Sequence, residues 1–505
     1  MSLAIVQTRA QVGIQAPLVT VEVHLSNGLP AMNMVGLPET AVKESKDRVR
    51  SAILNSNFEF PAKKITINLA PADLPKEGGR YDLAIAIGIL AAAGEIPAAL
   101  LKQHEFIGEL ALSGEIRPIR GILSAAIQTQ QTNKTLILPK DNAEEASLCQ
   151  GAQQKSANSL LEVCAYLCCQ SSLEEIENIE LPEFTADHAD LNEVRGQAQA
   201  KRALEITAAG KHNLLFIGPP GTGKTMLASR LPGILPPMSE QEALESAAIH
   251  SISQQQTVWL KQWKQRPFRS PHHTASGISL VGGGGKPKPG EISLAHGGIL
   301  FLDELPEFSR KVLDVLREPL ESGEICIARA SQQVTYPARF QLVAAMNPCP
   351  CGYYGDSSSK CTCTEDQVKR YQGQTSGPLL DRIDLQVEVP PISILELQKT
   401  HSSSQEDSAT VQARVLNAWQ TQTQRQQCSN GQLSNAQVEE FCRLNEEDEN
   451  LLRLAIEKLD LSARAYHRVL KISRTIADLD ESEHIQTGHI MEALSYRKLE
   501  RYRQN

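Results

Sequence analysis

The sequence lacks long apolar runs and has few aromatic residues, which make up 4% of the chain. Its most apolar stretch, Leu83 to Ala93, is far shorter than the roughly 20 residues that span a bilayer, so it predicts a buried helix instead. The N-terminus shows no basic patch leading into an apolar core, and we therefore expect no signal peptide and no membrane partner. These absences favour a globular, cytoplasmic α/β protein.

An excess of positive charge is also missing. The 59 acidic residues outnumber the 50 Lys and Arg residues, which gives a net charge of −9. Surfaces that coat nucleic acid are usually basic, so this balance argues against broad nucleic-acid coating, although it leaves room for a basic loop inside a ring. The 11 cysteines occur without an export signal, which argues against a disulfide scaffold.

With 505 residues, the chain is too long for one hydrophobic core, and its size predicts about three domains. Residues 1–172 alternate helical stretches with strand-like runs, which indicates a compact α/β domain. The strand-like runs are Thr20–Leu25, Ile65–Leu69 and Thr135–Leu138. Residues 173–189 are acidic and polar, as in a linker. A second α/β domain follows over 190–395, and the helical spacing of 396–505 predicts a helical lid.

A phosphate-binding motif opens the second α/β domain. The apolar strand Leu214–Ile217 runs into Gly218-Pro-Pro-Gly-Thr-Gly-Lys224-Thr225, which matches GxxxxGK[ST]. Its glycines let backbone N–H groups turn toward phosphates, while Lys224 supplies a charge and Thr225 a hydroxyl ligand for Mg²⁺. A strand before the motif and a helical segment after it argue against a chance glycine-rich turn. The predicted ATP-binding residues are Gly218, Pro219, Pro220, Gly221, Thr222, Gly223, Lys224 and Thr225.

Two carboxylates follow a later apolar strand, in Gly298-Ile-Leu-Phe-Leu-Asp303-Glu304. An apolar run that ends in Asp-Glu is common by itself, but behind a phosphate-binding loop it predicts a hydrolytic site. Asp303 is expected to hold Mg²⁺ and Glu304 to polarise the attacking water.

Other segments resemble parts of AAA+ ATPases. The strand Phe340–Met346 ends at Asn347, where AAA+ proteins carry a polar residue that helps to place the water. Arg382 resembles the arginine finger that reaches a neighbouring subunit's γ-phosphate, a task that suits a planar and permanently charged group. A salt bridge, with Asp384 or elsewhere on the surface, is the alternative.

The resemblance to AAA+ proteins extends to the lid and to the segment before the phosphate-binding loop. In the lid, Arg464 resembles the arginine called sensor 2, and Arg468, one turn later, is placed to share or replace that role. Upstream, Val194 and Gly196 resemble residues that border the adenine.

The chain resembles the ComM/YifB family of magnesium-chelatase-like AAA+ proteins almost from end to end. The matching stretches are Met34–Pro38, Asn68–Gly79, Phe268–Ser276, Pro289–Gly298, Asn347–Gly352, Gly377–Asp384 and Arg474–Leu479. The resemblance implies a homo-hexameric ring ATPase with active sites shared between subunits. It also implies a motor that acts on single-stranded or branched DNA and drives branch migration of DNA joints during natural transformation, with recombination proteins as partners.

The first domain resembles the proteolytic domain of Lon proteases, but it departs from them at both catalytic positions. Arg80 stands where Lon carries its serine, and the window Leu123–Ala125 offers no lysine. A Ser–Lys dyad needs both members, so we expect a degenerate Lon-like domain that is used for assembly or DNA handling.

This domain bears on the alternatives to a DNA motor. The main one is a magnesium- or cobalt-chelatase motor subunit that remodels a partner protein. Chelatase motor subunits usually lack a Lon-like domain, which favours the DNA motor. An AAA+ protease is disfavoured by the missing dyad.

Two insertions carry basic residues that are candidates for DNA binding. The loop Gly282–Gly290 contains Lys286 and Lys288, and a predicted β-hairpin over Ile325–Tyr336 contains Arg329. In related ring motors, hairpins at these places line the central pore, where a few cations per subunit grip phosphates. The alternative is a pair of solvated loops without a partner. His272 and His273, just upstream, suit either a structural or a ligand-binding role.

Four cysteines form a pattern of CxC, nine residues and CxC, at Cys349, Cys351, Cys361 and Cys363. Four thiolates in one loop are able to close a tetrahedral zinc site. Free or reversibly oxidised thiols are the alternative.

Overall fold

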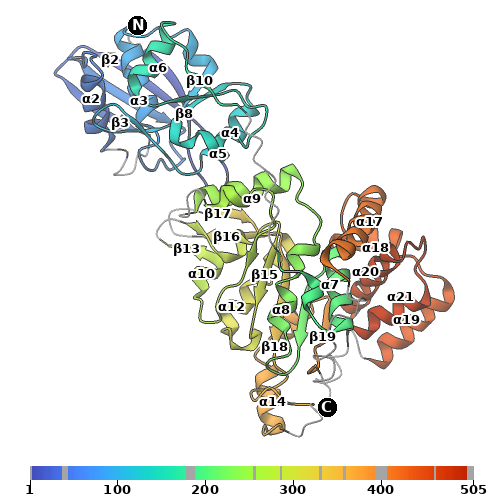
Figure 1. The fold of residues 1–505 in the computed structure, drawn as a ribbon. Coiled ribbons are helices and arrows are strands. Elements are labelled where there is room, and N and C mark those ends of the chain that lie inside the picture. The colour runs from blue at the N-terminus through green and yellow to red at the C-terminus, as the bar shows by residue number, and fades with distance from the viewer. Residues whose placement is uncertain are drawn as a thin grey trace. The chain divides into compact units, whose positions relative to one another are not determined.

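The structure is a computed structural model, and it describes residues 3–36, 42, 44–177, 188–253, 258–284, 287–328, 333–355, 360–392, 406–459 and 462–497. The chain forms two compact units (Figure 1). Unit 1 comprises residues 1–184 and 244–263, and unit 2 comprises residues 185–243 and 264–505. Most of the predicted linker, residues 178–187, lies outside the described residues.

Unit 1 is built on an eight-stranded mixed sheet of order β10-β9-β8-β5-β1-β2-β4-β3. The strands are β1 (Leu3–Arg9), β2 (Leu18–Ser26), β3 (Ala31–Val35), β4 (Lys64–Ala70), β5 (His104–Phe106), β8 (Thr135–Pro139), β9 (Gln154–Ala157) and β10 (Glu174–Glu175). The three strand-like runs of the sequence therefore lie in β2, β4 and β8, as predicted. The apolar stretch forms helix α3 (Asp82–Ala93), which is buried along almost its whole length, as predicted.

Residues 244–263 join unit 1 although they lie far from it in the sequence. They include most of α9 (Glu240–Ile252) and a short 3-10 helix, η5 (Val258–Gln262). Ala247, Trp259 and Leu260 are buried in one cluster with apolar side chains of the N-terminal chain. Ser251 also accepts a backbone hydrogen bond from Gly121 at 3.2 Å. The sequence alone gave no sign of this insertion.

Unit 2 contains a five-stranded, wholly parallel sheet of order β12-β15-β18-β11-β19. Its strands are β11 (Leu214–Ile217), β12 (Phe268–Arg269), β15 (Ile299–Leu302), β18 (Gln341–Met346) and β19 (Leu385–Glu388). β11, β15 and β18 are buried at every residue, which explains their continuous apolar sequences. All five strands end at the same edge, where open parallel sheets bind ligands.

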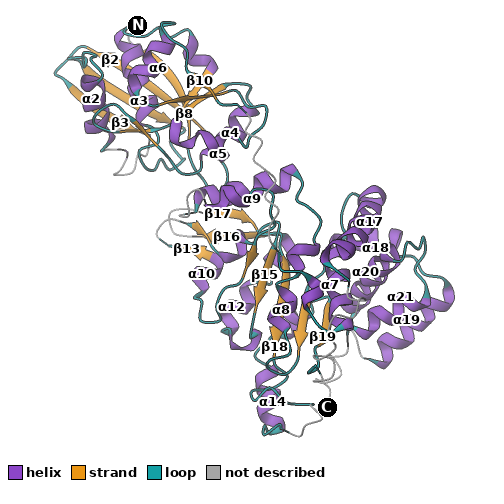
Figure 2. Cartoon of the chain, in the orientation of Figure 1, coloured by secondary structure: helices purple, strands orange, loops and turns teal. Residues whose placement is uncertain are grey.

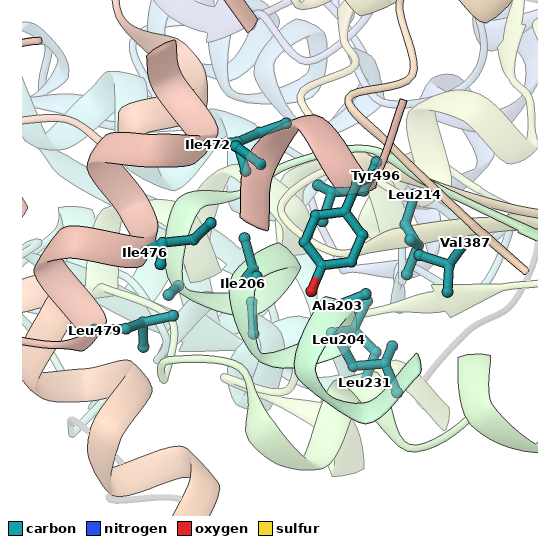
Figure 3. Close-up of a cluster of buried hydrophobic side chains, with 14 of the residues drawn as sticks. Ala203, Leu204, Ile206, Leu214, Leu231, Val387, Ile472, Ile476, Leu479 and Tyr496 are labelled. Carbon is teal, nitrogen blue, oxygen red and sulfur yellow. The ribbon is translucent and has the colours of Figure 1, made fainter. Parts of the chain in front are cut away.

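Past β19, the described residues of unit 2 form helices and no strand (Figure 2). The helices are α17 (Ser408–Gln426), α18 (Asn435–Phe441), α19 (Glu446–Lys458), α20 (Ala463–Leu479) and α21 (Thr487–Ser495). Ile472, Ile476 and Leu479 of α20 point toward Ile206 of α7 (Ala198–Gly210) (Figure 3). The expected α/β fold with a parallel sheet and C-terminal helices is therefore confirmed, whereas the Lon-like character of unit 1 stays a prediction.

Arg80 is embedded in unit 1 in a way that suits a structural residue. Its side chain is 6% exposed, and its guanidinium donates to the carbonyl of Arg120 at 2.8 Å and to Gln11 Oε1 at 3.2 Å. Burial lowers the pKa of Arg80. Leu123 and Ala125, on α4 (Ile122–Gln130), are fully buried.

We predict that the purified protein cleaves neither peptides nor unfolded proteins, with or without ATP, because both members of a Ser–Lys dyad are missing. Release of fluorescent peptides from labelled casein measures this, and R80S alone should stay equally inactive. Cleavage that persists through further purification and in a K224A variant would contradict the prediction.

Candidate nucleotide-binding site

The loop between β11 and α8 (Lys224–Ala228) lies at the carboxyl edge of the parallel sheet. Gly221 and Gly223 have φ angles of 80° and 88°, a left-handed conformation that glycine adopts without strain. At Gly218 the constraint is space, because a Cβ atom there would lie 2.2 Å from the carbonyl oxygen of Val389. The loop geometry therefore explains why glycine occupies these positions.

Lys224 is held inside this loop by three oxygen acceptors. Its Nζ donates to the carbonyls of Gly218 at 2.7 Å and Pro219 at 2.9 Å, and to Asn347 Oδ1 at 3.1 Å. Burial lowers the pKa of Lys224, and the carboxylates of Asp303 and Glu304 act in the opposite direction. Asn347 reaches Lys224 because β18 lies directly between β15 and β11 in the sheet.

Thr225 and Asp303 form the link between the phosphate-binding loop and the end of β15. The hydroxyl of Thr225 donates to Asp303 Oδ2 at 2.6 Å, and Asp303 Oδ1 accepts the backbone N–H of Glu304 at 2.9 Å. A hydroxyl and a carboxylate side by side are hard oxygen ligands of the kind that Mg²⁺ prefers. The structure thus brings together the two residues that the sequence suggested for Mg²⁺.

Glu304 turns away from β15 with a left-handed φ of 52°. Its Oε2 lies 3.1 Å from Nδ1 of His273. From its sequence context His273 suits either a structural or a ligand-binding role, and this contact with Glu304 was not predicted. The parallel pairing of β12 with β15 was the missing information, because it brings the ends of both strands to one edge.

The predicted arginines, Arg382 and Arg464, both lie in unit 2, but they differ in solvent exposure. The guanidinium of Arg382 pairs with Glu321, and its side chain is 9% exposed. Burial lowers the pKa of Arg382, as do the charges of Arg464, Arg317 and Arg468. Arg464 is exposed near the start of α20.

Asp384 pairs with Arg468 at 2.7 Å, and its Oδ2 accepts the backbone N–H of Asn213 at 2.9 Å. These contacts hold the pKa of Asp384 well below its usual range, against the effect of burial. Arg382 thus forms a salt bridge with Glu321 and not with Asp384, which pairs with Arg468.

The predicted adenine-bordering segment precedes α7. Val194 is buried, and Gly196 has a left-handed φ of 61°. Gln197 Nε2, next in the chain, donates to the carbonyl of Pro390 at 2.7 Å, one residue past the Val389 carbonyl that crowds Gly218. The segment therefore borders the phosphate-binding loop through the end of β19.

The four cysteines of the CxC pattern converge. Their sulfur atoms all lie within 4.8 Å of one another, and Cys349 Sγ is 3.3 Å from Cys351 Sγ. Hydrogen bonds from the backbone at Tyr353 and Thr362 lower the pKa of Cys351 to about 6. This loop also touches the nucleotide site, because a Cβ atom at Gly352 would lie 2.6 Å from Pro220 Cδ.

The predicted DNA-binding residues are described only in part. Lys286 and Arg329 lie outside the described residues, whereas Lys288 is exposed on β14 (Lys288–Pro289), which pairs with β13 (Gly282–Gly283). The predicted second hairpin is confirmed as β16 (Glu324–Ala328) and β17 (Gln333–Pro337). The two hairpins touch, since Tyr336 Oη donates to the carbonyl of Pro287 at 3.0 Å.

Comparison with known proteins agrees with this architecture. Family models for magnesium chelatase subunit ChlI match residues 190–397 and 21–142, and the model of its C-terminal part matches 405–497. Competence protein ComM of Haemophilus influenzae is 54% identical over 505 residues, which cover 99% of this chain and 98% of that protein. The chain belongs to the ComM/YifB family of magnesium-chelatase-like proteins.

Other proteins resemble this chain over its full length or over part of it. YifB of Salmonella typhimurium, named as uncharacterized, is 54% identical over 503 residues, with 99% of this chain and 98% of that protein covered. The magnesium-chelatase 38 kDa subunit of Rhodobacter capsulatus is 29% identical over 213 residues, which cover 38% of this chain and 54% of that subunit. In the part of the chain that the structure describes, no helix is long and apolar enough to cross a membrane.

Proposed function

We propose that the protein is an ATP-driven ring motor that moves single-stranded or branched DNA and drives branch migration during homologous recombination in natural transformation. The observation that carries the ATPase is the meeting of Lys224, Thr225–Asp303, Glu304 and Asn347 at one edge of a parallel sheet. The DNA substrate is supported by full-length similarity to a competence protein and by the two touching hairpins.

We assign each of these residues a role in hydrolysis. Lys224 would exchange its carbonyl contacts for phosphate oxygens, and Thr225 and Asp303 would hold Mg²⁺, an ion that would neutralise charge on the phosphates. Glu304 accepts a proton from the attacking water, and Asn347 orients that water beside the γ-phosphate. The loop 218–225 cradles the phosphates with its N–H groups, and the segment at Val194 and Gly196 borders the adenine.

In a homo-hexameric ring, a neighbouring subunit would supply arginines to each nucleotide site. Arg382, buried beside Glu321, belongs with Arg464 to a cluster of arginines; burial and the like charges of this cluster lower the pKa of Arg382, whereas Glu321 raises it. Such a cluster is stabilised by an anion, and the γ-phosphate of a neighbouring subunit's ATP is one of suitable charge and geometry. We therefore assign Arg382 and Arg464 to the shared site of a homo-hexamer.

The alternative is a chelatase-type motor that remodels a partner protein. It is supported by the chelatase family models and by the Rhodobacter capsulatus subunit, whose similarity spans only 38% of this chain. The two functions differ in their stimulant, which is DNA for the first and a partner protein for the second.

We also propose that Cys349, Cys351, Cys361 and Cys363 hold one structural zinc ion. Sulfur atoms within 4.8 Å of one another fit the spacing of a tetrahedral site with Zn–S bonds of about 2.3 Å. The convergence of the four sulfur atoms carries this proposal. The pKa of Cys351 is lowered, which favours the thiolate that binds metal, whereas the pKa values of Cys361 and Cys363 are raised.

For the ATPase, we predict that K224A loses nucleotide binding and that E304Q binds ATP but turns over at least about 100-fold more slowly, because general-base catalysis typically contributes that much. Fluorescent ATP binding and phosphate release measure the two effects. E307Q, which removes an exposed carboxylate three residues away, should behave like the wild type. Rapid turnover by E304Q would overturn the assignment.

For the metal, elemental analysis of protein purified without chelator should find close to one zinc per chain. A C351S/C363S double variant should lose the zinc, whereas C169S, which changes an exposed cysteine in unit 1, should keep it. Metal-free protein with four reactive thiols at this loop would favour the redox alternative.

For DNA, a K286A/K288A/R329A variant should bind single-stranded DNA more weakly, and its affinity should depend less steeply on salt. Each phosphate contact that is removed lowers the number of counterions released on binding by about one. Fluorescence anisotropy across a salt series measures the slope. K458A, which removes an exposed charge from α19 in the lid, should keep the wild-type slope. If the triple variant keeps the wild-type salt dependence, these three residues do not contact DNA phosphates.

A further inference from the structure

The first two cysteines of the CxC pattern lie in a tight turn, residues 349–352. Gly352 donates its backbone N–H to the carbonyl of Cys349 at 3.0 Å, and the side chain of Cys349 is fully buried. The backbone N–H of Tyr354 donates to Cys349 Sγ at 3.3 Å, which fixes the direction of this sulfur atom. The turn therefore belongs to the same ordered structure as the four convergent sulfur atoms.

This turn packs directly against the phosphate-binding loop. Gly352 is buried with a left-handed φ of 87°, and a Cβ atom on it would lie 2.6 Å from Cδ and 3.2 Å from Cγ of Pro220. Both the backbone conformation and the close approach thus require glycine. Pro219, just before Pro220, accepts Lys224 Nζ with its carbonyl at 2.9 Å. The turn therefore contacts the part of the loop that holds Lys224.

The residues just before the turn reach Lys224 directly. Asn347 Oδ1 accepts Lys224 Nζ at 3.1 Å, and only Pro348 separates Asn347 from the first cysteine. The carbonyl of Pro348 accepts Nε2 of Gln372 at 2.9 Å. Gln372 ends α14 (Glu365–Gln372), a helix whose N-cap residue directly follows the last cysteine. Segments on both sides of the cysteine cluster thus meet at Pro348.

We propose that the turn 349–352 braces the phosphate-binding loop, and that closure of the cysteine site by a metal ion fixes this brace so that ATP binds tightly. This inference rests on the proposed ATPase and the proposed zinc site, and it names what sets the ATP affinity. Gly352 is the positioning residue, because it brings the turn into contact with Pro220.

The physical reason is preorganisation of the loop. Its backbone N–H groups bind phosphate with less loss of free energy when the loop already has the bound geometry. The contact of Gly352 with Pro220 and the hydrogen bond from Lys224 to Asn347 Oδ1 hold that geometry from two sides of the same segment. Without a cation, thiolates at this spacing repel one another and loosen the turn.

The test measures the Kd for a fluorescent ATP analogue and the zinc content of full-length variants. G352A should bind ATP about 5- to 100-fold more weakly but keep its zinc, because its methyl group overpacks against Pro220. Its KM for ATP should rise in proportion, whereas its kcat should change little. G355A is the matched control: Gly355 has a left-handed φ of 81°, but a Cβ atom there would meet nothing within 4 Å. This variant should keep the wild-type zinc content and affinity.

Two further variants separate the contact from the metal. P220A removes the Cδ atom that the new methyl group meets, so G352A should weaken ATP binding less in a P220A background than in the wild type. C351S/C363S, which removes two metal ligands, should lose zinc and ATP affinity together. Zinc that is removed from the wild type by a zinc-selective chelator and then added back should lower and restore ATP affinity in step.

Several results would overturn the proposal. Equal ATP affinity in G352A and G355A would contradict the brace, and wild-type affinity in zinc-free C351S/C363S would contradict the role of the metal. A wild type that binds ATP tightly but carries no metal would contradict that role as well. Should G352A fail to fold, ATP affinity that stays unchanged after chelation of the wild type would reject the proposal. A wild type that binds no ATP would reject the proposed ATPase, whereas normal ATP binding by G352A rejects this inference alone.

Discussion

The hydrogen bond from Thr225 to Asp303, at 2.6 Å, joins the two halves of the candidate site, and most of unit 2 serves to make it possible. Thr225 opens the helix after β11, and Asp303 follows β15, which is separated from β11 in the sheet by β18. Parallel pairing with β18 brings both strand ends to one edge, and burial of these strands fixes their register. The geometry of the candidate site at this edge therefore depends on the apolar packing around the buried strands.

The same edge gathers elements that reach away from the nucleotide. The cysteine loop begins two residues after Asn347, and its Gly352 packs against Pro220 of the phosphate-binding loop. The hairpins connect to the edge through Arg269 and Glu291, and His273 touches Glu304 there. A metal in the cysteine loop and DNA on the hairpins would thus both act on residues at this edge of the sheet.

The features that the sequence predicted are those that depend on a local pattern of residues. The glycine spacing that ends at Lys224 and the apolar strand before Asp303 are each contained in about ten residues, and the cysteine cluster lies in one loop. What it missed depends on tertiary pairing: the contact of His273 with Glu304 requires the strand order β12-β15, and the pairing of Arg382 with Glu321 requires two distant segments to meet. The assignment of residues 244–263 to unit 1 was not predicted either, because the sequence of one short helical segment does not indicate which core it joins.

The central claim is that ATP hydrolysis at this edge is coupled to DNA. The most direct measurement is the ATPase rate of the wild-type protein at low salt, without nucleic acid and with single-stranded or forked DNA at saturating ATP. We expect both DNAs to raise kcat and this increase to shrink as the salt concentration rises, because phosphate contacts weaken with salt. A rate that neither DNA alters at low salt would contradict the account and favour the chelatase-type motor.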